Sequence, residues 1–471
     1  MSESMATPWQ TLDDGLGAQE LAWRERIELR LYQIACRAGT TDDPEIYQTC
    51  YRDFFDELDA IDHLLGERRF ALGGTQASIV DGWLSALLIR FEVVFYSLYK
   101  LNRQRLEEFA NLAHYLRDVR VAVPVPGTET IDAIRRRYYL ADNKINPLGR
   151  VPVGAPALSL PHDRELRFGR AKQLSDRDED PHAQRLQGEW VRPQSEHRTA
   201  TVDGERFRPE AGRYHLYIAN NCPWSHRTAL VRSLKGLEDV VSMDVLFYTR
   251  DPENGWQFRA EEPGCSADTL HNSRFIGDLY KRAGSTEKSV PLLWDRKTDS
   301  IVSNESAEIM RLFDVDFGTY ADSTWVLYPD HLAEQIDRLN VFIYHAVNNG
   351  AYKAGFAESQ EAYEDAYRRF FEALEYIDHM LRGRRFLLGD ELTESDVRLF
   401  PTIFRFDAVY YTRFNLNQRM VRDIPSLSRW LHTMLEIPAV RRSSDLTHCR
   451  KGYFGRTGNN IVPLGPLTLE P

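Results

Sequence analysis

Apolar residues recur at three- and four-residue spacing over two long stretches, one in the N-terminal third of the chain and one in the C-terminal third. The segment YRDFFDELDAIDHLLGERRFALG from Tyr51 matches YRRFFEALEYIDHMLRGRRFLLG from Tyr367, and LLIRFEVVFYSLYKLN from Leu87 matches TIFRFDAVYYTRFNLN from Thr402. This spacing is typical of amphipathic helices that pack into a bundle. The repeat is far too long for a solenoid. The pattern therefore predicts two copies of one helical domain of roughly 130 residues.

A different pattern separates the two copies. Residues from about Ala155 to Leu186 are polar and charged and predict a linker, after which short apolar runs alternate with one helical segment. The first elements predicted there are a strand over Arg213–Ala219, a helix over Pro223–Leu234 with Gly236 at its C-cap, and a strand from Val240. A hairpin follows, formed by SVPLLWD from Ser289 and SIV from Ser300. A helix then begins at Asn304-Glu305-Ser306. A βαβ unit, a hairpin and a closing helix predict a thioredoxin-like domain followed by a helical bundle.

Composition narrows the class of protein. With 42% hydrophobic residues, 27% charged residues and a formal charge of −11, the chain is expected to be globular and to bind neither nucleic acid nor an anionic membrane as its main partner. The most apolar stretch, Gly82 to Tyr99, contains Arg90 and Glu92, which favours a buried helix over a bilayer span. The amino terminus lacks the pattern of a secretory signal, and five scattered cysteines indicate reduced thiols. We therefore expect a cytoplasmic protein.

The stretch NNCPWSHRT carries the first candidate for chemistry. Cys222 falls where the predicted strand meets the predicted helix, and Pro223 occupies the favoured first helical position. Free N–H groups and the helix dipole there favour a thiolate. Ser225 replaces the second thiol of a redox pair, so an external thiol has to finish the reaction. His226, one turn further on, either supports the thiolate or makes a structural hydrogen bond. No other Cys or His stands nearby at ligand spacing, so no metal is expected.

Two further positions complete a cradle for a peptide-like thiol. In a thioredoxin-like layout, the backbone of Val290 before Pro291 is free to pair with such a ligand, whereas the isomer of this bond is not readable from the sequence. Glu305 and Ser306 open a helix whose N–H groups suit a carboxylate. Ordinary helix capping explains these two residues equally well when they are taken alone.

From about Gly188 to Pro466 the chain resembles the glutathionyl-hydroquinone reductases, the Xi class of glutathione transferases. The matching segments are RYHLYIANNCPWSHRT, ENGWQF, VPLLWDRKTDSIVSNESAEIMRLF, VNNGAYKAGFAESQEAY, LTESDVRLFPTIFRFDAVYY and the tail around GYFG. The resemblance implies that Cys222 attacks the glutathione sulfur of a glutathionyl-hydroquinone and that a second glutathione then releases oxidised glutathione. It assigns the co-substrate glutathione to Trp256, Val290, Pro291, Glu305 and Ser306. It implies that Tyr352 and Tyr453 line the aromatic pocket, with Trp224, and are catalytic, because their phenols hydrogen-bond to the hydroquinone oxygen and stabilise the leaving group. Tyr410 either joins this pocket or packs behind it.

The chain also departs from the family. Before Val290 the family usually carries a basic Gly-Arg that contributes to glutathione binding, whereas this chain reads GSTEKS, which leaves Lys288 as the candidate substitute. Cys265 has no assigned counterpart and is interpreted as incidental. In the first helical copy, CRAGTTDDP replaces NNGAYKAGF, so the Tyr352 equivalent is missing, while Tyr138 corresponds to Tyr453. We expect that copy to be non-catalytic and to pack as a partner's domain would, forming an internal pseudo-dimer, or else to shape the substrate pocket.

The expected fold is α/β plus all-α, with four parts: a duplicated transferase-type helical domain over 1–155, a linker over 156–186, a thioredoxin-like glutathione-binding domain over 187–325, and a helical domain with the aromatic pocket over 326–471. The expected function is glutathione-dependent reductive removal of glutathione from an aromatic conjugate. Two alternatives stay open: C–S bond cleavage on a specialised metabolite, and a non-catalytic binding or scaffold protein. A homodimer also stays open.

Overall fold

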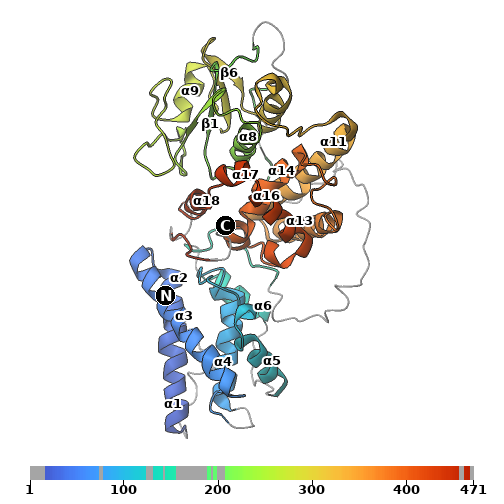
Figure 1. The fold of residues 1–471 in the computed structure, drawn as a ribbon. Helices are drawn as coiled ribbons and strands as arrows, with labels where there is room; N and C mark the ends of the chain where they lie inside the picture. The colour runs from blue at the N-terminus through green and yellow to red at the C-terminus, as the bar shows by residue number, and fades with distance from the viewer. Residues whose placement is uncertain are drawn as a thin grey trace. The chain divides into compact units, whose positions relative to one another are not determined.

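The computed structural model describes residues 16–73, 78–122, 131–141, 144–154, 188–192, 195–198, 207–455 and 461–466. The chain divides into two units (Figure 1). Unit 1 comprises Met1–Arg177, Tyr411–Gln418 and Thr457–Glu470, and unit 2 comprises Asp178–Tyr410 and Arg419–Arg456. The predicted linker, 156–186, lies outside the described residues.

Unit 2 begins with a four-stranded sheet in the order β2-β1-β5-β6. Its strands are β1 (Tyr214–Ile218), β2 (Val241–Val245), β5 (Leu292–Asp295) and β6 (Ser300–Ser303). β1 and β2 are parallel, because helix α8 (Pro223–Leu234) returns the chain between them, whereas β5 pairs antiparallel with β1 and with β6. Every residue of β1 is buried, as expected for a central strand covered on both faces. Figure 1 shows α8 on one side of the sheet and α9 (Ile276–Arg282) on the other.

This arrangement is the thioredoxin-like layout that the sequence predicts. Helix α8 has the predicted bounds because Pro223 occupies its first position, and Gly236 follows its end with φ +66°. A small ribbon of β3 (Arg250–Asp251) and β4 (Gly255–Trp256) stands apart from the main sheet, and α10 (Ser306–Arg311) closes the domain.

The rest of unit 2 is helical. Its main helices are α11 (Ala333–Phe342), α12 (Asn349–Gly355), α13 (Gln360–Met380), α14 (Glu394–Phe404), α16 (Pro425–Glu436), α17 (Pro438–Arg442) and α18 (Leu446–Phe454). Short 3-10 or π-helical turns join or extend them: η5 (Leu312–Asp316), η6 (Gly318–Tyr320), η7 (Asp330–Leu332), η8 (Ile343–Asn348), η9 (Phe406–Tyr410) and η10 (Val421–Asp423).

Unit 1 is helical throughout its described part. Its elements are α1 (Ala18–Glu25), η1 (Arg26–Tyr32), α2 (Gln33–Thr40), α3 (Pro44–Glu67), α4 (Ile79–Arg90), η2 (Phe91–Phe95), η3 (Leu106–Glu108), α5 (Leu112–Ala122), α6 (Ile131–Tyr139) and α15 (Tyr411–Arg413). The rings of Tyr96 and Tyr411 pack 5.9 Å apart in this unit. The amino group of Lys100 donates to the carbonyl of Ile461 over 2.8 Å.

Matching hydrogen bonds recur in the two helical regions. In unit 1 the carboxylate of Asp81 accepts from the backbone N–H of Ala71 over 2.7 Å, and in unit 2 Asp396 accepts from Leu387 over 2.9 Å. Both aspartates are fully buried at the third position of a capped helix. Asp62 and Asp378 likewise accept from the first N–H groups of α5 and α16, respectively. These groups hold corresponding helix ends in both regions.

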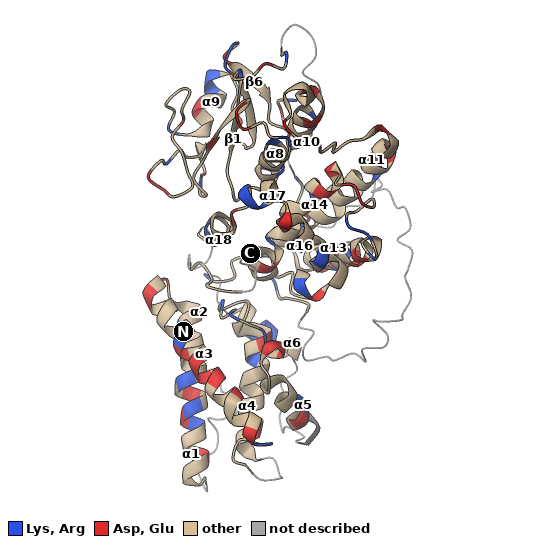
Figure 2. Cartoon of the chain, viewed as in Figure 1, with Lys and Arg blue, Asp and Glu red and all other residues tan. Residues whose placement is uncertain are grey.

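The apolar stretch Gly82 to Tyr99 forms the buried end of α4 and the turn η2, as predicted. Within the described residues, no helix combines the length and apolar character needed to cross a bilayer. Figure 2 shows acidic and basic segments interspersed along α1 and α3 of unit 1 and over the helices of unit 2.

Candidate functional site

Cys222 lies in the turn between β1 and α8, where it is the N-cap residue of the helix. Its backbone N–H donates to the carbonyl of Ala219 over 2.9 Å, which closes the turn. The thiol is 9% exposed and donates to the carbonyl oxygen of Val290, 3.6 Å from Sγ. Since the first N–H groups of a helix and its dipole favour negative charge, this position suits a thiolate.

The position that a second thiol would occupy is held by the hydroxyl of Ser225. Ser225 is fully buried, and its Oγ accepts from the backbone N–H of Ala219 over 3.4 Å. The same N–H stands three residues before Cys222, so Ser225 braces the turn that presents the thiol. Its contribution is structural rather than redox.

Val290 and Trp256 lie with Cys222 around one apolar cluster. The peptide bond between Val290 and Pro291 is cis. Cys222, Trp224 and Val290 belong to this cluster, and Trp256 packs against it from β4. The structure therefore brings together four of the residues that the sequence assigns to the site.

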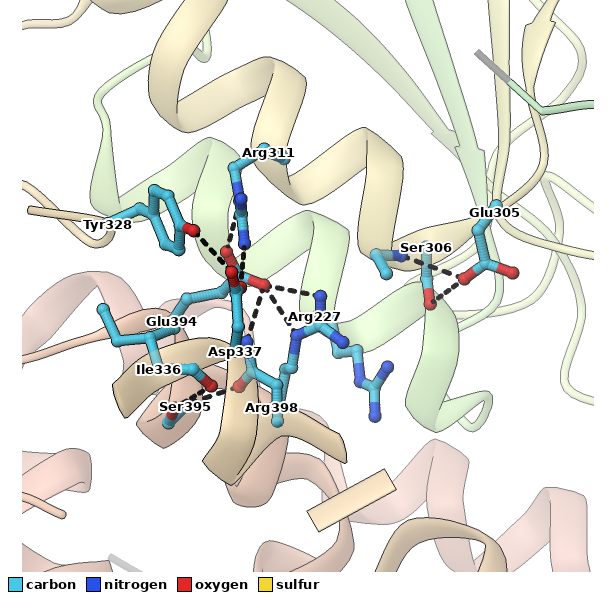
Figure 3. Close-up of polar contacts among 12 residues, drawn as sticks. Arg227, Glu305, Ser306, Arg311, Tyr328, Ile336, Asp337, Glu394, Ser395 and Arg398 are labelled. Carbon is cyan, nitrogen blue, oxygen red and sulfur yellow. Dashed lines mark hydrogen bonds and ion pairs between the residues drawn. The ribbon is translucent and has the colours of Figure 1, made fainter. Parts of the chain in front are cut away.

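Glu305 and Ser306 lie at the N-terminus of α10, as predicted, but the carboxylate of Glu305 turns back onto that terminus (Figure 3). Oε1 of Glu305 accepts from the N–H of Ala307 over 3.1 Å and from the Ser306 hydroxyl over 3.4 Å, while Oε2 accepts from the Ser195 hydroxyl over 3.1 Å. The chain's own carboxylate thus caps this helix, as the capping alternative predicts, and binding of glutathione by the pair stays a prediction.

Lys288 is bound to the loop between β3 and β4. Its amino group donates to the carbonyl oxygens of Glu253 and Pro252 over 2.7 and 3.2 Å. The neighbouring Glu287 accepts from Asn304 over 3.0 Å and from Ser289 over 2.8 Å. The stretch before Val290, where the sequence predicts a cation, therefore supplies the carboxylate of Glu287 to these hydrogen bonds.

Three tyrosines from three elements join their hydroxyl groups. Tyr453 on α18 hydrogen bonds to Tyr352 on α12, and its hydroxyl also lies 3.2 Å from that of Tyr410 at the end of η9. The rings of Tyr410 and Tyr453 are 5.5 Å apart and nearly perpendicular. Tyr410, whose role the sequence left open, therefore belongs to the phenol cluster.

Burial keeps these phenols protonated. It raises the pKa of Tyr352, and the thiol of Cys222 raises it further, whereas Tyr453 and Arg405 lower it. Burial likewise raises the pKa of Tyr410 and of Tyr453 well above the usual range. The three hydroxyl groups are consequently protonated hydrogen-bond donors at neutral pH.

A glycine allows α18 to approach the Cys222 turn. A Cβ atom on Gly452 would lie 2.1 Å from Nδ2 of Asn221, the residue before Cys222. Asn221 in turn donates to the carbonyl of Tyr248 over 2.9 Å. Because no side chain stands at 452, α18, which carries Tyr453, can pack closely against the residue that precedes Cys222.

Two residues that the sequence analysis missed cover this site. The guanidinium of Arg192 lies 3.8 Å from the ring centroid of Trp224, and Arg227 lies 4.3 Å from the same ring. The ring of Trp190 lies 5.6 Å from that of Tyr352. Both residues belong to GEWVR, which has no periodic pattern and forms no helix or strand, so no local signal singled them out.

A third missed residue, Arg405, lies behind the tyrosines. It is fully buried, with Nη2 3.2 Å from Nδ1 of His226 and Nε donating to the sulfur of Cys449 over 3.4 Å. Burial, together with Arg405, lowers the pKa of His226 well below its usual range. A signal did exist, because an arginine interrupts the apolar run in both copies, at Arg90 and at Arg405.

An ion network joins the sheet domain to the helical domain within unit 2 (Figure 3). Glu394, at the N-terminus of α14, accepts from Nε of Arg311 on α10 and from Nε of Arg398, each over 2.7 Å. Arg311 also reaches Asp337 of α11 over 3.4 Å. Since Glu394 is almost fully buried, this network holds α10 against α11 and α14 of the helical domain.

The counterpart position in unit 1 has different chemistry. Cys36 precedes Tyr51 by the same number of residues as Tyr352 precedes Tyr367. Burial raises the pKa of Cys36, and the hydroxyl of Tyr138 donates to that of Tyr32 over 3.2 Å. The Cys36 thiol therefore stays protonated, unlike a nucleophile.

All five cysteines are free thiols. Burial, Glu262 and Asp445 raise the pKa of Cys265 to about 11, which suits its interpretation as incidental. Across the described ranges, no group of three or more His, Cys, Asp or Glu residues is arranged to hold a metal ion.

Comparison with known proteins identifies the two parts of unit 2. Residues 221–315 match the family model described as "Glutathione S-transferase, N-terminal domain", and residues 360–433 match "Glutathione S-transferase, C-terminal domain". The chain is 42% identical to glutathionyl-hydroquinone reductase YqjG of Escherichia coli over 56% of this chain and 81% of that protein. It is 38% identical to glutathionyl-hydroquinone reductase PcpF of Sphingobium chlorophenolicum over 60% and 92%.

Solved structures give the same picture. The glutathione S-transferase Xi of Phanerochaete chrysosporium aligns with a TM-score of 0.58 at 40% identity and covers 60% of this chain and 94% of that one. The glutathione-bound structure of YqjG from Escherichia coli aligns with a TM-score of 0.54 at 41% identity, over 56% of this chain and 89% of that one. The matched region is the C-terminal part of the chain.

Proposed function

Because the chain belongs to the Xi class of glutathione transferases, the family that includes the glutathionyl-hydroquinone reductases, we propose that it removes glutathione from glutathionyl-hydroquinone-type aromatic conjugates. One observation carries the proposal. The Cys222 thiol lies at the start of α8, 3.6 Å from the Val290 carbonyl, and α18, which carries Tyr453 of the linked phenols, packs against Asn221, the residue before Cys222. This arrangement supports a site with a thiol, a free backbone edge and proton donors, as reductive removal of a thiol from an arene requires.

In the first step the Cys222 thiolate attacks the glutathione sulfur of the conjugate. The new bond is a Cys222–glutathione disulfide, and the bond that breaks joins this sulfur to the ring. In the keto tautomer of the conjugate, the carbon that bears sulfur already carries its proton. The electron pair of the C–S bond then passes through the ring carbon to the keto oxygen. This oxygen takes a proton, and the arene leaves as the free hydroquinone. Tyr352 and Tyr453, held protonated by burial, donate hydrogen bonds to this oxygen.

In the second step the thiolate of another glutathione attacks the mixed disulfide. Oxidised glutathione leaves, and the Cys222 thiolate is restored, so the conjugate's own glutathione sulfur and the thiol of the second glutathione together supply the two electrons that reduce the arene. Ser225 cannot take this role, because it is a buried hydroxyl bonded to the backbone. The co-substrate would lie along the backbone of Val290 beside Pro291 and Trp256, with its γ-glutamyl end toward Glu305 and Ser306.

The direct test uses the wild-type protein and Cys222→Ala with a glutathionyl-hydroquinone and glutathione. We expect the wild type to form one oxidised glutathione for each free hydroquinone, and Cys222→Ala to form neither. Cys265→Ala is the matched control, because it removes a thiol with a raised pKa outside the site. Equal rates for wild type and Cys222→Ala would overturn the mechanism. Free arene without oxidised glutathione would instead indicate C–S cleavage of another kind.

We also propose that residues 1–155 are a second, non-catalytic copy of the helical domain at 326–471, with 156–186 as linker and 187–325 as the glutathione-binding domain. The matched bonds of Asp81 and Asp396 support a common origin. The pairing of Tyr96 with Tyr411 supports an internal pseudo-dimer, because these residues correspond in the repeat and a two-fold interface brings equivalent residues together.

Replacing both Tyr96 and Tyr411 by Asp tests this arrangement in the full chain. We expect the doubly substituted protein to bind an apolar-surface dye or to self-associate in light scattering, because apolar surface becomes exposed. A well-behaved variant with unchanged size and dye binding would contradict the pseudo-dimer. The free cysteines also lead us to propose the cytoplasm as the compartment, which imaging of a tagged protein can check.

A further inference from the structure

Arg405 is a buried cation beside the proposed site, and the proposed reaction does not yet use it. It follows α14 directly and is fully buried. Its side chain donates to the backbone carbonyl of Pro401, to Nδ1 of His226 over 3.2 Å and to the sulfur of Cys449 over 3.4 Å. Within the described part of the chain, no Asp or Glu forms an ion pair with it.

A positive charge without a carboxylate is expensive to bury, so such a group calls for a reason. Burial alone would lower the pKa of Arg405, but the Cys449 thiol and the phenols of Tyr410 and Tyr453 raise it above the usual range. The side chain is therefore charged, and neutral, polarisable groups surround it. His226 is neutral as well, since its pKa is held well below the usual range. The surroundings of Arg405 consequently hold an uncompensated positive charge, which stabilises a negative charge that develops nearby.

The three linked phenols are joined to that charge through α18, because Arg405 donates to Cys449, which stands one turn before Tyr453 on this helix. Arg405 lowers the pKa of Tyr352, of Tyr410 and of Tyr453 against the opposing effect of burial. Tyr453 hydrogen bonds to both of the other hydroxyl groups. A phenol chain that ends beside a fixed cation can donate more strongly to an oxygen at its other end, because each donor is polarised by the next.

From these contacts we propose that Arg405 is a positioning residue for the departure of the hydroquinone. It acts through the Tyr410–Tyr453–Tyr352 cluster, and its charge stabilises the negative charge that develops on the hydroquinone oxygen as the C–S bond breaks. Arg405 touches neither the substrate nor Cys222. The inference rests on the proposed function, because only the step that expels the arene generates charge at this oxygen. Exchange between Cys222 and oxidised glutathione generates none.

The experiment measures the two half-reactions separately in Arg405→Met and Arg405→Lys. We expect Arg405→Met to lower kcat for hydroquinone release by about tenfold to a hundredfold, as for loss of an electrostatic contact in a protected site. Arg405→Lys, which keeps the charge, should recover most of this loss. The rate at which oxidised glutathione modifies Cys222 should stay within about threefold of the wild type in both variants. A series of ring-halogenated conjugates adds a measurement that does not change if Arg405 is only structural. The fold decrease in kcat of Arg405→Met should become smaller as the released hydroquinone becomes more acidic.

A second pair of variants keeps the test valid if Arg405→Met does not fold. Cys449→Asp places a carboxylate against Nε and neutralises the charge with the guanidinium still in place, whereas Cys449→Ser keeps a neutral acceptor there. We expect Cys449→Asp to show the slow release of Arg405→Met and Cys449→Ser to stay within about threefold of the wild type.

The outcomes separate this inference from the proposed function. If the wild type releases hydroquinone and Arg405→Met or Cys449→Asp releases it equally fast, Arg405 has no such role while the function stands. If both half-reactions slow together, or Arg405→Lys is no better than Arg405→Met, the residue acts through packing and the inference is wrong. If the wild type itself releases no hydroquinone although Cys222 reacts with oxidised glutathione, the proposed function fails first.

Discussion

Nη2 of Arg405 lies 3.2 Å from Nδ1 of His226. Because a guanidinium can only donate, Nδ1 of His226 accepts, and the ring proton must be on Nε2, which lies 3.2 Å from the hydroxyl of Ser444. Although His226 stands one turn from Cys222, both its nitrogens are therefore engaged away from the thiol. Of the two roles that the sequence left open, the geometry supports the structural hydrogen bond.

This relationship predicts how stability changes with pH. Since the pKa of His226 is held well below its ordinary value of 6.5 by burial and by Arg405, the unfolded chain binds a proton near pH 6.5 and the folded chain does not. His226 therefore does not lower the free energy of unfolding above pH 6.5. Below pH 6.5 this free energy falls by about 1.4 kcal/mol for each pH unit, because only the unfolded chain takes up the proton. Denaturant unfolding between pH 5 and 8 should show a smaller acid loss in His226→Gln. His432→Gln, at an exposed site, is the control, and an equal slope in wild type and His226→Gln would contradict this reading.

Trp190 is predicted to help select the aromatic substrate. Its ring packs 5.6 Å from Tyr352 and 6.1 Å from Phe356, so it covers the phenol cluster. Trp190→Ala should raise KM for aromatic conjugates by about tenfold, because a partly buried aromatic contact is lost, and should leave the reaction of Cys222 with oxidised glutathione unchanged. Arg198→Ala is the matched control, because it removes a half-exposed ion pair with Glu308 from the same segment. An unchanged KM in Trp190→Ala would remove the residue from the site.

Gly452 is predicted to tolerate no side chain. A Cβ atom 2.1 Å from Nδ2 of Asn221 forces either α18 or the Cys222 turn to move. Gly452→Ala should lower kcat by about tenfold and the free energy of unfolding by about 1–3 kcal/mol, the usual effect of overpacking. Gly318→Ala is the control, since nothing lies within 4 Å of its added Cβ. A fully active Gly452→Ala would mean that the approach of α18 does not position Tyr453.

Lys288 is predicted to contribute little to binding of the thiol co-substrate. Its amino group already donates to the carbonyls of Pro252 and Glu253. Steady-state kinetics of Lys288→Ala should therefore give a KM for glutathione within about threefold of the wild type, because an exposed amino group held by loop carbonyls adds little to binding. A tenfold or larger rise would show that Lys288 leaves the loop to bind the co-substrate. Lys281→Ala, on the outer face of α9, serves as the control.

The sequence by itself determined the four strands of the main sheet, helices α8 and α10 and the two helical regions, but not β3, β4 or α9. Proline at the first position of α8 and glycine after its end set the bounds of that helix, and three- and four-residue spacing marked the two helical regions. The same local signals placed Cys222 at a strand-to-helix turn. The repeat likewise paired Tyr138 with Tyr453 and showed that no tyrosine stands at Cys36.

Only the tertiary structure decided which side chains meet in the site. Arg405 and His226 are 179 positions apart in the chain, and Tyr352 and Tyr453 are 101 apart, so no spacing rule joins them. The tertiary structure also decided the hydrogen-bond partners of Glu305 and Lys288. Glu305 accepts from the backbone of its own helix, and Lys288 donates to carbonyls of a neighbouring loop, because polar groups in a folded chain bond to the donors and acceptors nearest to them. Local propensity acts over a few residues, whereas the charge and hydrogen bonding of a buried site depend on elements that come together only when the sheet and the helices pack.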